Sequence, residues 1–168
     1  MKKDRIHRLA GSAMMAALVL LVTMVLRVPS PMGGFVNLGD APVLLSGWLL
    51  GPWWGAAAAG LGAAAADLIS GAAYFAPGTF LVKGAMAVAA ALVAKRLTPR
   101  LRPFWAELWA GIVAELVMIA GYFGYTSLLL GRGLAAAASI PGNCLQALAA
   151  LVIALPVMAG MRARRGEE

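Results

Sequence analysis

Charged residues are scarce in this chain. They make up 12% of its 168 residues, whereas 62% of the residues are hydrophobic and the mean hydropathy is +0.84. A soluble globular domain carries about 25% charged residues, so the composition excludes that class. Because a membrane helix needs about 20 apolar residues, about six spans would use nearly the whole chain. We expect no soluble catalytic or ATPase domain within it.

Several kinds of reactive site are missing as well. Cys144 is the only cysteine, so an internal disulfide is impossible. The only histidine, His7, lies before the first apolar segment, which excludes a serine–histidine protease and a histidine metal site within the membrane. No glycine-rich loop ends in Lys-Ser or Lys-Thr, the signature of a phosphate-binding ATPase loop. We therefore expect no catalytic residue, no metal site and no ATP site in this chain.

What the chain does contain is a series of apolar segments separated by proline and glycine. They predict an all-α membrane protein, with a single integral-membrane domain over residues 1–168. The first segment lacks a small-residue cleavage site after it, so we interpret it as a retained helix rather than a signal peptide. The six expected spans are about 9–27, 39–53, 55–72, 78–95, 105–130 and 138–161.

The net charge of +7 is unevenly distributed. Most of the basic residues form three clusters. These are Lys2, Lys3, Arg5 and Arg8; Lys95, Arg96, Arg100 and Arg102; and Arg162, Arg164 and Arg165. Positive clusters mark the cytoplasmic side of a membrane protein. Six spans place all three clusters there, together with both termini, whereas five or seven would divide them. We therefore expect membrane lipid, and not nucleic acid, to be the partner of this charge.

Small residues recur at four-residue spacing in two segments. The third span contains Gly60-x-x-x-Ala64 and Gly62-x-x-x-Ala66, a pattern that lets helices approach closely in lipid. It predicts an interior, close-packed helix. The first span has the same spacing at Ala13 and Ala17 and at Ser12 and Ala16. That surface would serve either an internal helix or another protein.

Polar side chains within the spans are few, and each is costly in a bilayer. All except Glu115 lie within about 10–15 Å of the predicted outer surface, at 1.5 Å per residue. This shared depth predicts an outward-open pocket, which the loop 29–38 would cover as a lid. The polar groups are Asp40, Asp67, Lys83, Glu115, Tyr122, Asn143 and Gln146. We predict that all of these except Asp40, together with Asn37 from the loop, bind substrate.

Structural roles compete with binding at each of these positions. Asp67 and Lys83 would also fit a structural ion pair. Asp40 follows Gly39 at the start of the second span, where it would fit a helix cap. Glu115, Asn143 and Gln146 would fit hydrogen bonds to neighbouring helices.

Five short motifs resemble one known family. They are Gly33-Gly34-Phe35-Val36-Asn37-Leu38-Gly39-Asp40-Ala41, Gly51-Pro52-x-x-Gly55, Ala66-Asp67-Leu68, Ala76-Pro77-x-Thr79 and Val82-Lys83-Gly84. As a set, the motifs are similar to those of S components of energy-coupling factor (ECF) transporters, in the riboflavin-type and related branch. The similarity covers residues 30–90 in detail and the whole chain in length and topology.

The resemblance implies a vitamin-binding subunit of the prokaryotic plasma membrane, with its site on the outer side. It implies partners as well: a transmembrane T component, which Ala13 and Ala17 would dock, and two cytoplasmic ATPase subunits that use ATP. Ligand contacts would come from Asn37, Lys83 and Tyr122, and from Asn143 and Gln146 in the sixth span. The motifs favour hydroxymethylpyrimidine or pyridoxine as the substrate, with riboflavin and pantothenate as alternatives.

Two other functions are compatible with parts of the sequence. A stand-alone proton-coupled transporter would use Asp67 or Glu115 as its proton carrier. An intramembrane enzyme of lipid metabolism would need catalytic groups near the cytoplasmic interface, where Glu107 alone is available. The missing ATPase motif and the shared depth of the polar groups favour the vitamin-binding subunit over both.

Overall fold

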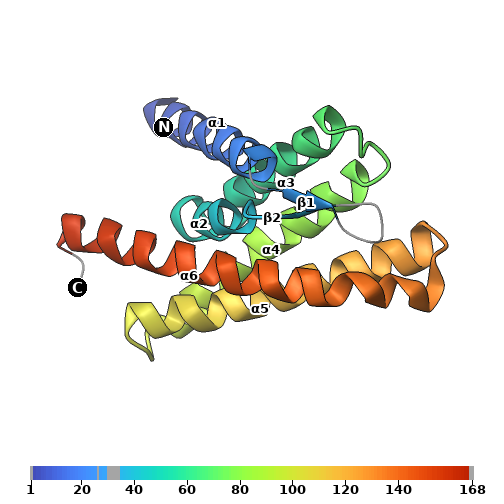
Figure 1. Cartoon of the computed structure of the whole chain (residues 1–168). Coiled ribbons are helices and arrows are strands. Elements are labelled where there is room, and N and C mark those ends of the chain that lie inside the picture. Colours follow the sequence, from blue (N-terminus) through green and yellow to red (C-terminus); the bar gives the residue numbers. More distant parts are fainter. Residues whose placement is uncertain (1, 26, 30–34, 167–168) are drawn as a thin grey trace.

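The computed structural model describes residues 2–25, 27–29 and 35–166. Helices dominate this part of the chain (Figure 1). The α-helices are α1 (Lys2–Val25), α2 (Asp40–Leu50), α3 (Pro52–Ile69), α4 (Ala76–Leu97), α5 (Pro103–Gly124) and α6 (Ile140–Arg165). A short π-helical turn, η1 (Tyr125–Leu129), and a 3-10 segment, η2 (Gly133–Ser139), connect α5 to α6.

The predicted all-α class is confirmed. Proline explains several of the boundaries, because it fits the first turn of a helix and disturbs the hydrogen bonds of later turns. Pro52 and Pro103 begin α3 and α5. Between α2 and α3 the chain turns at Gly51, whose φ of 80° favours glycine.

The number of helices that cross the membrane is a separate question. Four helical segments are long and apolar enough to do so within the described residues: Arg5–Val25, Ala76–Leu97, Pro103–Leu129 and Gly133–Arg165. Helix α2 has 11 residues, or about 16 Å at 1.5 Å per residue, whereas the apolar core of a bilayer is about 30 Å thick. That all six segments span the membrane, with both termini in the cytoplasm, stays a prediction.

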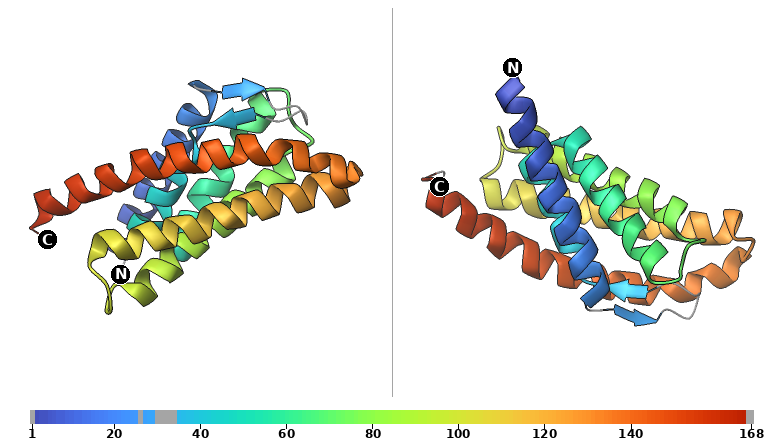
Figure 2. Two further views of the ribbon diagram at one scale, coloured as in Figure 1. Left: turned by 60° about the horizontal axis from the view of Figure 1, so that its bottom comes forward. Right: turned by 90° about the horizontal axis from the view of Figure 1, so that it is seen from above.

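The helices form one tightly packed group and one long pair. Helix α3 packs against α1, α2 and α4, and α4 also packs against α5. Helices α5 and α6 run alongside each other over most of their length (Figures 1 and 2), and α2 fills the space between α6 and the first group. The interior contains polar as well as apolar side chains, which positions the site described below.

Glycines allow α3 to touch three helices through their backbones. A Cβ added at Gly55 would lie 2.6 Å from the carbonyl oxygen of Ser46 in α2, and one at Gly60 would lie 2.8 Å from that of Phe80 in α4. At Gly62 it would lie 2.4 Å from the carbonyl oxygen of Ala16 in α1. Close packing of the third span is therefore confirmed.

The same helix is not wholly interior. Leu61 and Leu68 of α3 are each 59% exposed in the isolated chain. They lie on the face away from the glycines, where lipid would cover them. The prediction of an interior helix therefore holds for the glycine face only.

The two pairs of small residues in α1 lie on different faces of the helix. Ser12 and Val19 are buried, and Ala16 approaches Gly62 of α3. Ala13 and Ala17 are exposed instead. The internal contact thus uses the Ser12–Ala16 pair, which leaves the Ala13–Ala17 pair open.

The connection between α1 and α2 contains two strands that the sequence did not predict. β1 (Arg27–Pro29) pairs with β2 (Phe35–Asn37) in an antiparallel hairpin, with Val28 opposite Val36. The hairpin lies beside α6 (Figure 2). The centre of the predicted lid, residues 30–34, falls outside the described residues.

The Gly62 contact generates a stability prediction. We expect Gly62→Ala to reduce the free energy of unfolding by about 1–3 kcal/mol, because overpacking a close contact carries a cost of that size and the obstacle is backbone. Thermal unfolding of the protein in detergent micelles measures the change. Gly84→Ala is the control, since its new Cβ would lie 3.6 Å from the nearest atom. Equal effects of the two substitutions would contradict the proposed contact.

Candidate functional site

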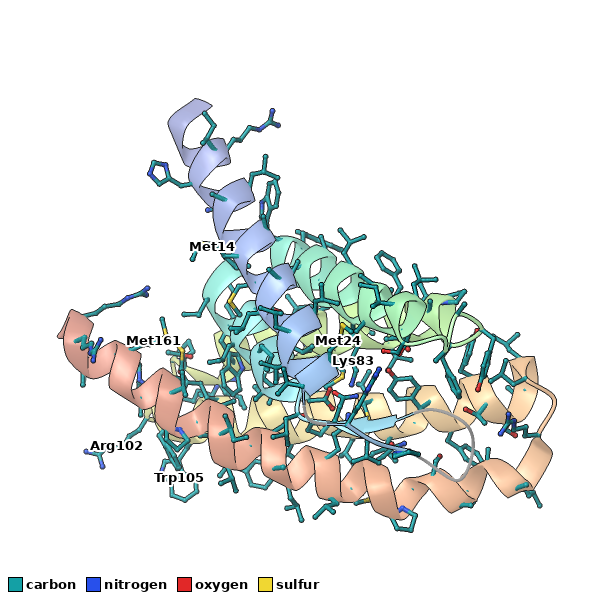
Figure 3. The ribbon with its side chains drawn as sticks, turned by 45° about the horizontal axis from the view of Figure 1, so that its top comes forward. Met14, Met24, Lys83, Arg102, Trp105 and Met161 are labelled. Atoms are coloured by element: carbon teal, nitrogen blue, oxygen red, sulfur yellow. The ribbon has the colours of Figure 1, made fainter. Side chains whose placement is uncertain are left out.

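A buried ion pair lies at the centre of the structure. Asp40, the first residue of α2, is fully buried and pairs with Lys83 of α4, whose side chain is 3% exposed. Figure 3 shows Lys83 in the interior of the bundle, near the end of α1 and the hairpin. A carboxylate and an ammonium group removed from water need such partners, because an unpaired buried charge carries a large cost.

Gln146 of α6 connects this pair to the hairpin. Its Nε2 donates a hydrogen bond of 2.6 Å to Oδ2 of Asp40, and its Oε1 accepts one of 2.8 Å from the backbone N–H of Asn37. The Oδ1 of Asn37 in turn accepts a bond from the N–H of Gly39. One side chain thus fixes α6, α2 and β2 relative to one another.

A second set of polar contacts leads from Lys83 toward α3. The Nζ of Lys83 lies 5.2 Å from the ring centre of Tyr122, within the range of a cation–π interaction. The Tyr122 hydroxyl donates to Oγ1 of Thr79 over 3.1 Å, and Asp67 of α3 lies near enough to interact with Thr79 and Lys83. The network therefore reaches five helices, α2 to α6.

Glu115 of α5 has no hydrogen bond in this network. It is 3% exposed, and neither carboxyl oxygen has a hydrogen-bond partner among the described residues. It nevertheless interacts electrostatically with Asp40 and Lys83. A buried carboxyl group with two unused acceptor oxygens can receive donors from a bound molecule or carry a proton.

Two sequence interpretations need correction. The ion pair of Lys83 is with Asp40, whereas Asp67 interacts with Lys83 only at longer range. Asp40 is not the cap of α2: Gly39 is in that position, no side chain caps the helix, and Asp40 uses its carboxylate on Lys83 and Gln146. Its place at the start of an apolar helix made a cap the obvious assignment.

The structure brings together most, but not all, of the predicted binding residues. Asn143 is buried in α6, one turn before Gln146, and makes no side-chain hydrogen bond to a described residue. Asp40 was missing from the predicted set, although it shared the outer depth that selected the others. Its burial beside Lys83 is the signal that only the fold supplies.

A hollow of about 420 Å³ adjoins the network. It lies between the end of α1, the hairpin and α6, and is lined by Val25, Arg27, Val36, Asn37, Leu38, Leu145, Gln146 and Ala149. Pockets for small molecules usually measure about 300–1,000 Å³ and are mostly apolar with a few placed polar groups. Asn37 and Gln146 supply such groups here, and Gln146 belongs to both the hollow and the ion-pair network.

Comparison with known proteins identifies the family to which the chain belongs. Residues 3–163 match the family described as "ECF-type riboflavin transporter, S component". The chain belongs to this family.

Solved S components share the fold of the new family member. One, described as the S component of a bacterial ECF transporter, superposes with a TM-score of 0.75 at 20% identity, over 98% of this chain and 99% of that one. Another, the S component for biotin from an ECF-type ABC transporter, gives a TM-score of 0.62 at 20% identity, over 95% and 94%.

A relative in sequence is an uncharacterized protein of Pyrococcus woesei named for its position in the gap 3′ region. It is 33% identical over 136 residues, which are 80% of this chain and 88% of the relative. This S component is therefore a membrane transport protein and not an enzyme. The preference for hydroxymethylpyrimidine or pyridoxine finds no support, since the family description and the solved relatives specify riboflavin and biotin.

The ion pair generates a second stability prediction. We expect Lys83→Met to cost about 3–5 kcal/mol, because it leaves the Asp40 charge buried and unpaired. Adding Asp40→Asn should recover most of the loss, since removing both charges of a buried pair is often close to neutral. Thermal or denaturant unfolding in micelles compares the three proteins. A double variant that loses the sum of both single effects would show that the two residues do not act as a pair.

Proposed function

We propose that this S component is the substrate-binding subunit of an ECF-type importer for a small vitamin. It would lie in the prokaryotic plasma membrane as a multi-pass protein with both termini in the cytoplasm. The observation that carries the proposal is the hollow beside α6, which Gln146 connects to a buried polar network inside an apolar bundle. Such a site suits capture of a small polar molecule.

The favoured ligand is riboflavin or another vitamin of similar size. Two properties of the site support a heterocycle of low charge over a polyanion. The hollow is mostly apolar, with Arg27 as the one charged residue among those that line it, and the charges of Asp40 and Lys83 in the adjoining network neutralise each other. Hydrogen-bonding ring nitrogens and hydroxyl groups would match Asn37 and Gln146.

The partners would be a transmembrane T component and two cytoplasmic ATPase subunits, which would use ATP for transport. The exposed Ala13–Ala17 pair on α1 is the proposed docking surface for the T component. Small side chains there permit the close helix contact that association in lipid requires. If uptake instead needs no ATPase and follows a pH gradient, a stand-alone transporter that uses Asp67 or Glu115 would replace this proposal.

Filling the hollow should abolish ligand binding. We expect Ala149→Trp to lower the affinity for riboflavin at least about tenfold, which corresponds to about 1.4 kcal/mol, because the indole would occupy the space that the ligand needs. Protein purified alone is first extracted and analysed by mass spectrometry for a co-purified vitamin. Titration of the ligand-free protein, followed by fluorescence or calorimetry, then gives the dissociation constant.

The matched control is Leu148→Trp, which adds the same ring one residue earlier. Leu148 is 63% exposed and does not line the hollow, so its replacement should leave affinity unchanged. Equal loss in both variants, or full binding by Ala149→Trp, would place the ligand elsewhere. No binding of any vitamin by the wild-type protein would refute the proposed function itself.

Docking is tested on α1. We expect Ala13→Trp to prevent co-purification with the T component and the ATPases while vitamin binding is retained, because a large ring would hold the two helices apart. Leu18→Trp is the control, since Leu18 is also exposed but lies on the other flank of α1. Assembly that survives Ala13→Trp and fails with Leu18→Trp would assign docking to the opposite flank.

A further inference from the structure

A second hollow lies at the far end of the α5–α6 pair. It measures about 410 Å³ and lies between the start of α5 and the end of α6. Its lining consists of Arg102, Pro103, Phe104, Trp105, Ala159, Arg162 and Ala163. Figure 3 shows Arg102 and Trp105 close together beside α6. We call this hollow the α5–α6 groove. It shares no lining residue with the hollow near Gln146.

The charge of the groove is positive. Arg162 pairs with Glu107 of α5, and the side chains of both are largely buried, so these two charges neutralise each other. Arg102 is exposed and makes no ion pair with any residue that the structure describes. One uncompensated guanidinium group therefore remains at the mouth of the groove. Arg164 and Arg165, in the last turn of α6, add positive potential near it.

The backbone at the start of α5 adds to this potential. Arg102 is the N-cap residue of α5, and no side chain caps the helix there. The N-terminus of a helix carries a partial positive charge that favours an anion. Arg102 and the helix end thus attract the same kind of group.

The walls of the groove are apolar and aromatic. Phe104 and Trp105 are 42% and 50% exposed and meet edge to face, with their ring centres 5.5 Å apart. Tryptophan is enriched where the headgroups of a bilayer meet its apolar core. Ala159 and Ala163 leave room on the α6 side. A molecule with a phosphate at one end and hydrocarbon at the other would complement both parts of the groove.

We propose that the α5–α6 groove binds an anionic phospholipid, with its phosphate at Arg102 and its glycerol and upper acyl chains against Trp105. Basic pockets at the cytoplasmic side of membrane proteins bind such headgroups. This inference rests on the proposed orientation of the chain, which places this end of the bundle on the cytoplasmic side. It does not depend on the identity of the vitamin, whose proposed site lies near the other end.

The test compares phosphatidylglycerol with phosphatidylcholine on the full-length protein in detergent micelles. Native mass spectrometry over a lipid titration gives an apparent dissociation constant for each. We expect preferential binding of phosphatidylglycerol and an increase of about fivefold in its constant for Arg102→Gln, because one basic residue at an anionic lipid surface contributes about 1 kcal/mol. Vitamin binding is measured on the same preparations and should not change.

Arg96→Gln is the matched control. Arg96 is exposed in the last turn of α4 and does not line the groove, so the substitution removes the same charge without touching it. Equal weakening by the two variants would mean general attraction and would overturn a specific site. Inorganic phosphate that protects the protein from thermal unfolding as well as phosphatidylglycerol does would also overturn it. So would unchanged lipid binding by Arg102→Gln combined with lost T-component assembly, which would make the groove a protein contact.

Discussion

Removing a carboxylate and an ammonium group from water costs several kcal/mol for each ion, and this protein does so where α2, α4 and α6 meet. Asp40 and Lys83 compensate through their contact, and Gln146 supplies Asp40 with a further donor. The arrangement requires three helices and the hairpin to hold one relative position. Tyr122, Thr79 and Asp67 extend that requirement to α3 and α5. Polar contacts therefore define the geometry of a bundle whose apolar surfaces alone would permit many.

The polar network helps to determine the shape of the hollow beside α6. Gln146 lines it on one side and bonds the backbone of Asn37, another lining residue, on the other. A ligand that broke the bond between Gln146 and Asn37 would leave a buried polar group without a partner, which carries a cost of about 1–3 kcal/mol. The network thus selects for molecules that supply hydrogen bonds in return, which hydrocarbon alone cannot do.

The helical class and its approximate boundaries could be predicted from sequence because apolar length and proline position are local properties. Close packing of α3 was predictable for the same reason, since small residues recur four positions after Gly60 and Gly62, and both glycines make close contacts. The partner of Lys83 was not. Asp40 and Asp67 are both acidic and near the same predicted depth, and only the packing of α2 inside the bundle decides between them. The hairpin was missed because strands of three residues leave almost no periodic pattern.

The glycines of α3 have a mechanical consequence. Where two helices meet through side chains, rotamer changes can absorb a small displacement of one of them. Gly62 meets the carbonyl of Ala16 in α1, and Gly60 meets that of Phe80 in α4, so backbone atoms that no rotamer change can move form part of each contact. A push or tilt applied to α1 is passed through α3 to α4, the helix that carries Lys83. A force on the outer surface of α1 would therefore displace α1, α3 and α4 together, and with them the part of the polar network that lies on α4.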